Sequence, residues 1–216
     1  MSLIKRYLNW FIIFIISMLP LSLILFALQK APGHIISNNV GILLVLIIIL
    51  IIFFTYKYAV AIKIISPIKK EYFKIKEISL GFLLLMFTSM ITGIISQKLG
   101  TSQTSNQASL NELSKEIPFF LFALVSIVAG FFEELVYRVG VFKLLAPKYP
   151  KLAFLISVLI FGFAHNPTDL GSFLIYMSLA TALTYIYYHF ENFYLNMTVH
   201  ALWNTFVTLL SLTLIK

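Results

Sequence analysis

The most informative segment of this chain is AGFFEELVYR, residues 129–138. It places Glu133, Glu134 and Arg138 inside a run that otherwise has the apolar composition of a membrane-spanning helix. A charge near the centre of a bilayer costs about 3 kcal/mol on insertion scales and more in simulations, so such residues usually face a protein interior and serve a function. The segment therefore predicts a polar site buried within a bundle of membrane helices.

The composition of the whole chain agrees with this prediction. Of its 216 residues, 60% are hydrophobic and only 11% are charged, whereas about 25% are charged in an average soluble domain. The net charge is +8, but the basic residues separate apolar runs and do not form a basic face, which argues against a nucleic-acid partner. Cysteine is absent, which excludes disulfides, thiolate metal ligands and a cysteine nucleophile. We expect an integral membrane protein that is embedded in the lipid bilayer.

Apolar runs along the chain predict an all-α, polytopic bundle of about seven transmembrane helices in a single membrane domain, residues 1–216. The predicted spans cover about 8–28, 40–62, 78–96, 117–146, 151–165, 171–189 and 193–214. Residues 1–96 form the N-terminal helices of this domain, and residues 117–214 form the helices with the polar motifs.

Two polar segments lie between these spans. In residues 63–77 apolar residues recur at helical spacing between lysines, which predicts a short interfacial helix, with a solvated loop as the alternative. Residues 97–116 are rich in Ser, Thr, Asn and Gln, which predicts an exposed loop.

The distribution of basic residues predicts the orientation of the bundle. With the N-terminus in the cytoplasm, most of the 16 Lys and Arg residues fall at cytoplasmic helix ends. Those at outer ends are Lys30, Lys98, Lys115 and Lys216. Such an imbalance favours an N-in, C-out topology, which agrees with an odd number of spans.

Three polar clusters interrupt the last four predicted helices: Glu133-Glu134 with Arg138, His165, and His200 with Asn204. Counted from the nearest helix ends at 1.5 Å per residue, Glu134, His165 and Asn204 lie about 18 to 21 Å deep, and His200 lies one turn lower than Asn204. The three clusters can therefore meet in one layer of the bundle. The alternative is a buried polar network that only joins helices.

The spacing within the first cluster separates the roles of its two acids. Glu134 and Arg138 are four residues apart, in the orientation that favours a helical ion pair, so we expect them to be structural and supporting. Glu133 points about 100° away from Glu134 on a helix and stays free to act as a general base.

The other two clusters supply partners for that base. His165 can share a water molecule with Glu133. His200 and Asn204 are four residues apart, share a helical face and can donate hydrogen bonds to a developing oxyanion. A buried base, an activated water and an oxyanion hole together predict hydrolysis of an amide or an ester.

These residues also resemble the motifs of a known family. Glu-Glu-x-x-x-Arg at 133–138, Phe-x-x-x-His at 161–165 and His-x-x-x-Asn at 200–204 are similar, in this order, to the three motifs of the CPBP (CAAX protease and bacteriocin-processing, or Abi) intramembrane proteases. That family includes type II CAAX prenyl endopeptidases and bacteriocin-processing or self-immunity proteins, and the resemblance covers about residues 117–208. It implies that Glu133 is the base, that His165 is its partner on the water, and that His200 and Asn204 stabilise the oxyanion.

A metal is the main open point of the chemistry. Glu133, His165 and His200 have the residue types of a zinc site with two histidines and one carboxylate. The sequence has no His-Glu-x-x-His motif, these residues come from three separate helices, and a glutamate-activated water needs no metal. We therefore favour a mechanism without a cofactor, with a divalent metal such as zinc as the alternative.

The sequence predicts an intramembrane endopeptidase of the bacterial plasma membrane that cuts a prenylated or leader-bearing peptide. The competing hypothesis is a non-catalytic membrane protein that binds a peptide or confers immunity to a bacteriocin. A proton-coupled transporter fits less well, because the chain has no internal repeat and a single acidic cluster.

Overall fold

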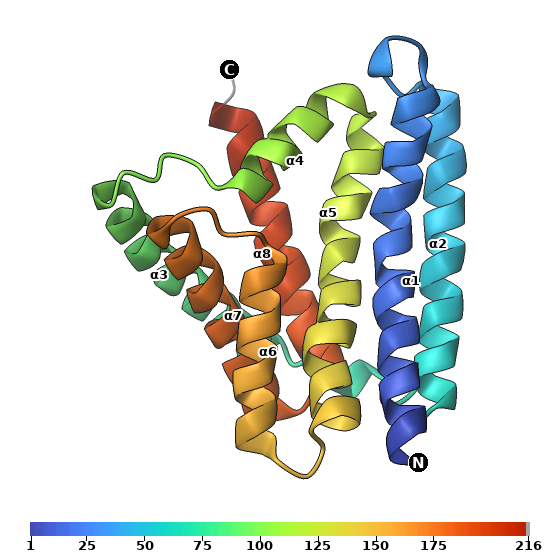
Figure 1. Cartoon of the computed structure of the whole chain (residues 1–216), viewed down its shortest axis with the longest axis vertical. Coiled ribbons are helices and arrows are strands. Elements are labelled where there is room, and N and C mark those ends of the chain that lie inside the picture. Colours follow the sequence, from blue (N-terminus) through green and yellow to red (C-terminus); the bar gives the residue numbers. More distant parts are fainter. Residues whose placement is uncertain (215–216) are drawn as a thin grey trace.

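A computed structural model describes residues 1–214 of the chain, and every regular element in that range is helical (Figure 1). The elements are α1 (Leu3–Lys30), η1 (Pro32–His34), α2 (Asn38–Ala61), η2 (Lys70–Tyr72), α3 (Ile75–Lys98), α4 (Ser105–Glu116), α5 (Phe119–Glu133), η3 (Glu134–Leu145), α6 (Pro150–Ala164), α7 (Leu170–Phe190) and α8 (Phe193–Leu214). The all-α prediction is confirmed.

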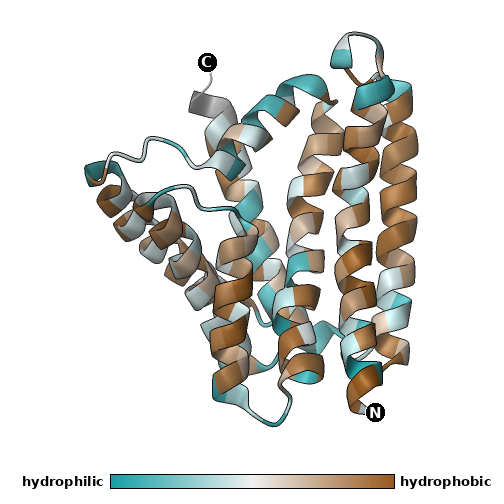
Figure 2. Cartoon of the chain, viewed as in Figure 1, coloured by the Kyte–Doolittle hydropathy of each residue, from teal (hydrophilic) through white to brown (hydrophobic). Residues whose placement is uncertain are grey.

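Most of these helices have the length and apolar composition of membrane spans (Figure 2). Five segments within the described range qualify by length and composition: α1, α2, Lys70–Lys98, Phe119–Leu145 and α7. Helix α6 is apolar but has only 15 residues, and α8 carries the polar residues of the third motif. The described part of α8 ends at the opposite end of the molecule from the start of α1 (Figure 1). The polytopic helical bundle is thus confirmed, while the N-in orientation stays a prediction.

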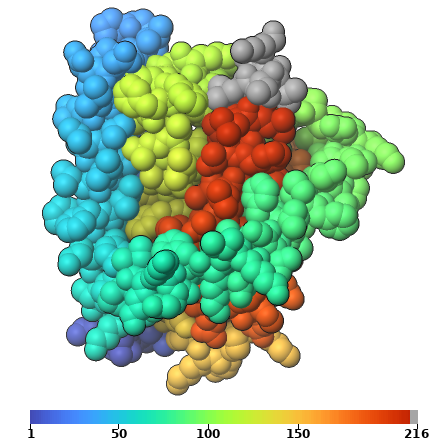
Figure 3. All heavy atoms as spheres, turned by 180° about the vertical axis from the view of Figure 1, so that it is seen from behind, coloured from blue at the N-terminus to red at the C-terminus, as the bar shows by residue number. Residues whose placement is uncertain are grey.

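Packing brings the motif-bearing helices together at the centre of the bundle. Helices α1 and α2 cover one side of the span formed by α5 and η3, and α6 covers another. Helix α8 packs between α5 and α3, as the view from behind shows (Figure 3). Helix α5 contacts α8 directly, and Glu133 and His200 face each other across this interface.

Two glycines allow close approach at this centre. A Cβ atom at Gly130 would lie 3.1 Å from the backbone nitrogen of Ala201, so α5 and α8 touch backbone to backbone one turn before Glu133. A Cβ atom at Gly140 would lie 2.7 Å from the Trp10 ring, whose Nε1–H donates to the carbonyl of Val136 at 3.1 Å. This bond fixes α1 against η3, a π-helical continuation of α5, and such widened turns often occur at functional sites.

The interfacial helix predicted over residues 63–77 does not form, which corrects that expectation. Residues 63–74 are irregular apart from the single turn η2, and residues 75–77 are the first residues of α3. The Tyr72 ring stacks on the Tyr194 ring at a centroid distance of 5.2 Å, and the Tyr72 carbonyl accepts a hydrogen bond from Asn192 Nδ2 at 2.8 Å. These contacts with the α7–α8 turn hold the segment out of a regular helix.

The predicted loop over residues 97–116 is wrong in its second half, which forms α4. Thr104 caps the helix by accepting the Gln107 N–H at 3.2 Å, and Leu113 is buried in the core. A sequence with few apolar residues therefore still forms a helix, because its short apolar face packs onto the bundle.

Candidate active site

The buried end of the site is an ion pair between Glu134 and Arg138, which lie one turn apart at the start of η3. Both side chains are completely buried, with 3.2 Å between Arg138 Nη1 and Glu134 Oε1. The Arg138 guanidinium also lies 4.2 Å from the centroid of the Phe161 ring. This pairing agrees with the structural role expected for both residues.

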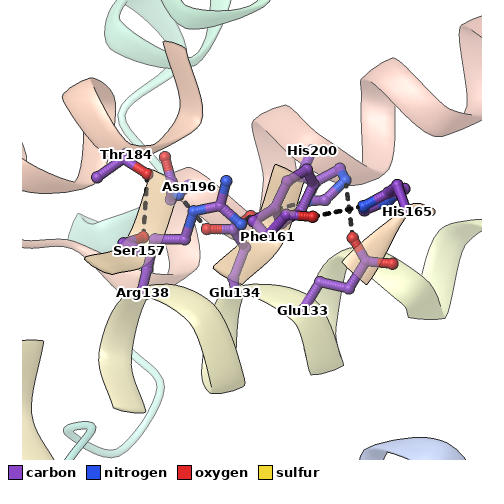
Figure 4. Close-up of polar contacts among 9 residues, drawn as sticks. All are labelled: Glu133, Glu134, Arg138, Ser157, Phe161, His165, Thr184, Asn196 and His200. Carbon is purple, nitrogen blue, oxygen red and sulfur yellow. Dashed lines mark hydrogen bonds and ion pairs between the residues drawn. The ribbon is translucent and has the colours of Figure 1, made fainter. Parts of the chain in front are cut away.

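Glu134 also accepts hydrogen bonds from two side chains of α8 (Figure 4). Asn196 Nδ2 donates to Oε2, and His200 Nδ1 lies 2.7 Å from Oε1. Because a carboxylate only accepts, Nδ1 of His200 carries the hydrogen of this bond. That bond fixes the orientation of the imidazole and directs Nε2 toward Glu133.

Glu133 is the exposed member of the acidic pair. Its side chain is 26% exposed, and its Oε2 lies 3.6 Å from His200 Nε2. This oxygen is buried and accepts no hydrogen bond from any residue between 1 and 214. Glu134 is thus fully occupied by contacts with protein groups, whereas Glu133 can accept a proton or bind a small molecule.

His165 follows the last residue of α6, and its ring is held on several sides. Its Nδ1 lies 2.8 Å from the Phe161 carbonyl oxygen, so Nδ1 carries the hydrogen and Nε2 has no hydrogen when the ring is neutral. The ring also stacks on Tyr176 at a centroid distance of 4.6 Å. Figure 4 shows the side chains of Glu133, His165 and His200 converging from three helices.

The structure separates Asn204 from these contacts. Asn204 Nδ2 donates to the carbonyl of Ser126 on α5 at 3.1 Å, one turn of α8 beyond His200. One amide hydrogen therefore joins α8 to α5, and the proposed oxyanion role depends on the other.

Asn196, which holds Glu134, was not predicted from the sequence. Its signal was the spacing of residues 196, 200 and 204, which places two asparagines and a histidine on one helical face.

Glu133, His165 and His200 are the ligands expected under the alternative, metal-dependent mechanism. Among residues 1–214, no group of three or more His, Asp or Glu side chains has the arrangement needed to hold an ion. Whether Glu133, His165 and His200 work with or without a metal stays a prediction.

The fold and the site together define the class: a polytopic helical membrane protein with acid–base residues buried between its helices near the middle of the 27-residue span Phe119–Leu145. The family model described as type II CAAX prenyl endopeptidase Rce1-like matches residues 115–206. This range contains all three motifs. The chain belongs to the CPBP family of intramembrane proteases.

Individual relatives extend the similarity beyond the motif-bearing helices. The UPF0177 protein YvdC of Lactococcus lactis is 42% identical over 207 residues, which cover 95% of this chain and 78% of that protein. The membrane-embedded CAAX protease MroQ of Staphylococcus aureus is 33% identical over 142 residues, which cover 62% of this chain and 56% of MroQ. No solved structure matches the chain.

Proposed function

We propose that this protein is an intramembrane endopeptidase in which Glu133 activates a water molecule. The observation that carries the proposal is the division between the two adjacent acids. Glu134 is completely buried and bound by Arg138, Asn196 and His200, whereas Glu133 is partly exposed and has a free oxygen. A carboxylate oxygen to which no protein group donates a hydrogen bond can accept the proton of a water.

The proposed first step uses Glu133 and His165 on one water molecule. The unprotonated Nε2 of His165 and the Glu133 carboxylate each accept one hydrogen of the water, which orients its oxygen toward the scissile carbonyl. As that oxygen bonds to the carbonyl carbon, Glu133 takes the proton. The carbonyl oxygen becomes the oxyanion of a tetrahedral intermediate.

His200 and Asn204 are the proposed donors to that oxyanion. When His200 is doubly protonated, Nδ1–H stays on Glu134 and Nε2–H is available to the oxyanion. Together with Arg138, Glu134 and Glu133, this state has no net charge, which lowers the cost of burial. Asn204 adds its second amide hydrogen.

The intermediate collapses when the carbon–nitrogen bond breaks. The proton held by Glu133 passes to the leaving amine, so Glu133 returns to its ionised form and the water has been divided between the two products. No step in this sequence requires a metal.

The proposed substrate is a peptide with a lipidated C-terminus or a leader, and the proposed location is the bacterial plasma membrane. Support for the substrate class comes from the match to the prenyl endopeptidase family model and from the similarity to MroQ, which is named as a CAAX protease.

The test is cleavage of a C-terminally lipidated peptide and a panel of leader peptides by purified protein, followed by mass spectrometry. We expect the wild type to cut at least one peptide with and without a chelator, and Glu133→Gln to cut it at least about 10²-fold more slowly. The matched control is Glu112→Gln, an exposed glutamate of α4. Equal cleavage by wild type and Glu133→Gln would refute the proposal. Protection from a bacteriocin that survives Glu133→Gln would instead favour the binding-only hypothesis.

A further inference from the structure

We propose that Tyr176 is a positioning residue for His165, and that the N-terminus of α4 holds Tyr176 in place. The inference rests on the proposed function in one respect, namely that His165 orients the attacking water. It assigns a role to α7 and α4, which carry none of the three motifs.

The His165 ring is confined by Tyr176 and Phe161. Tyr176 stacks on it at 4.6 Å with 25° between the planes, and the Phe161 ring lies 4.4 Å away with 37° between the planes. The hydrogen bond from Nδ1 to the Phe161 carbonyl fixes rotation within the ring plane. Phe161 supplies two of these contacts from the same helix, so Tyr176 is the restraint that comes from another element.

Tyr176 is itself anchored by a hydrogen bond to Thr104. Its side chain is buried, and its hydroxyl lies 2.7 Å from Oγ1 of Thr104. Thr104 is the N-cap of α4, where the same oxygen accepts the Gln107 N–H. A hydroxyl has one hydrogen and two lone pairs, so Thr104 can hold both partners at once. The position of the Tyr176 ring is therefore tied to the start of α4.

Two more hydrogen bonds join the same segments. Ser105 Oγ donates to the Asn166 carbonyl at 3.0 Å, and Thr101 Oγ1 donates to Asp169 Oδ1 at 2.6 Å. Asn166, the residue after His165, has a φ of +49°, a left-handed conformation that needs support from its surroundings. Residues 101–105 thus dock along the loop that follows His165.

These contacts lead to a specific dependence. If the start of α4 undocks, Tyr176 loses its anchor and the His165 ring loses its restraint on one face. The contacts that hold the buried Glu134–Arg138 ion pair come from α8 and from Phe161 of α6, so this pair should stay intact. Docking of α4 therefore controls the water-orienting group and leaves the structural pair unchanged.

A chemical probe tests this independently of proteolysis. Diethyl pyrocarbonate acylates unprotonated imidazole nitrogens, and mass spectrometry gives the rate at each histidine. We expect Tyr176→Ala to raise the rate at His165 several-fold, and Tyr176→Phe, which keeps the ring but loses the hydrogen bond to Thr104 Oγ1, to raise it by a smaller factor. The control is Tyr185→Ala, which removes a tyrosine of the same helix that stacks on His189 at 6.2 Å. An unchanged rate at His165 in Tyr176→Ala would overturn the inference.

A second pair of variants tests the anchor if Tyr176→Ala does not fold. Thr104→Val removes the hydroxyl and should raise the acylation rate at His165, whereas Thr104→Ser keeps the hydroxyl and should match wild type. Equal rates in Thr104→Val and Thr104→Ser would show that α4 does not hold Tyr176.

Peptide cleavage supplies the functional readout. We expect Tyr176→Ala to lower kcat by about 10²-fold with little change in KM, because a misplaced orienting group affects the chemical step more than binding. An unchanged kcat would overturn the positioning role. If the wild type cuts no peptide, the proposed function fails, and the acylation rates still decide whether Tyr176 positions His165.

Discussion

Neutralising Glu134 should strongly destabilise the protein, and the size of the effect follows from its contacts. Glu134 is completely buried, forms an ion pair with Arg138, and accepts hydrogen bonds from His200 and Asn196. The Gln side chain has nearly the same shape as Glu. It leaves the buried Arg138 charge without its ion-pair partner, and it points an amide NH₂ at one of the two donors, His200 or Asn196, that the carboxylate accepted from. Breaking a buried ion pair by changing one partner costs about 3–5 kcal/mol. We expect a loss of that size.

The companion variant is Glu134→Gln combined with Arg138→Met. It removes the unpaired Arg138 charge and places an apolar side chain against Phe161, so the double variant should be more stable than Glu134→Gln alone. The free energy of unfolding can be measured by titration with sodium dodecyl sulfate in mixed micelles. Trp10 provides a fluorescence probe, because its indole is bonded to η3 beside this pair.

The surface glutamate Glu112 sets the scale for this comparison. It forms an exposed pair with Lys115 at 2.8 Å, so Glu112→Gln should change the free energy of unfolding by less than about 1 kcal/mol. The reasoning would be refuted if Glu134→Gln lowered the free energy of unfolding by no more than Glu112→Gln does. It would also be refuted if the double variant Glu134→Gln with Arg138→Met lost as much stability as the two single variants added together.

Three further predictions concern packing, pH and metal. Gly130→Ala should cost about 1–3 kcal/mol, because its Cβ would lie 3.1 Å from the Ala201 backbone, whereas Gly93→Ala, with nothing within 4 Å, should be neutral; thermal unfolding compares the two. Hydrogen bonds from the Ser172 N–H and the Thr101 hydroxyl hold the pKa of Asp169 below its usual 3.8. These bonds therefore stabilise the folded protein above about pH 4, and this stabilisation is lost as the pH falls through the lowered pKa. Melting temperatures of wild type and Asp169→Asn should therefore differ at pH 6 and converge at acid pH, and a constant difference would contradict this. Peptide cleavage should persist after dialysis against a chelator, and loss that zinc restores would establish a metal enzyme.

Much of the fold could be predicted because the bilayer limits the choices. Apolar runs long enough to span a membrane become helices, since only helices satisfy the backbone there. The two errors, over residues 63–77 and 97–116, lie between spans, where water also satisfies the backbone. There the outcome depends on contacts such as Tyr72 with Tyr194 and Leu113 with the core, which a local pattern does not reveal.

The site was partly predictable for a similar reason. Charged groups inside apolar helices are expensive, so Glu133, Glu134, Arg138 and His200 stand out, and helical spacing gave the Glu134–Arg138 pair. The spacing did not reveal that His200 bonds to Glu134 as well as facing Glu133, because this depends on how α8 packs on α5.

The most direct test of the account compares kcat and the free energy of unfolding in Glu133→Gln and wild type under the same detergent conditions. If Glu133 is the general base, the substitution should lower kcat by about 10²- to 10⁴-fold. The free energy of unfolding should change little, because the Glu133 carboxylate is partly exposed and its Oε2 accepts no hydrogen bond from residues 1–214. Undiminished kcat in the folded Glu133→Gln protein would contradict the central claim that this residue activates the water.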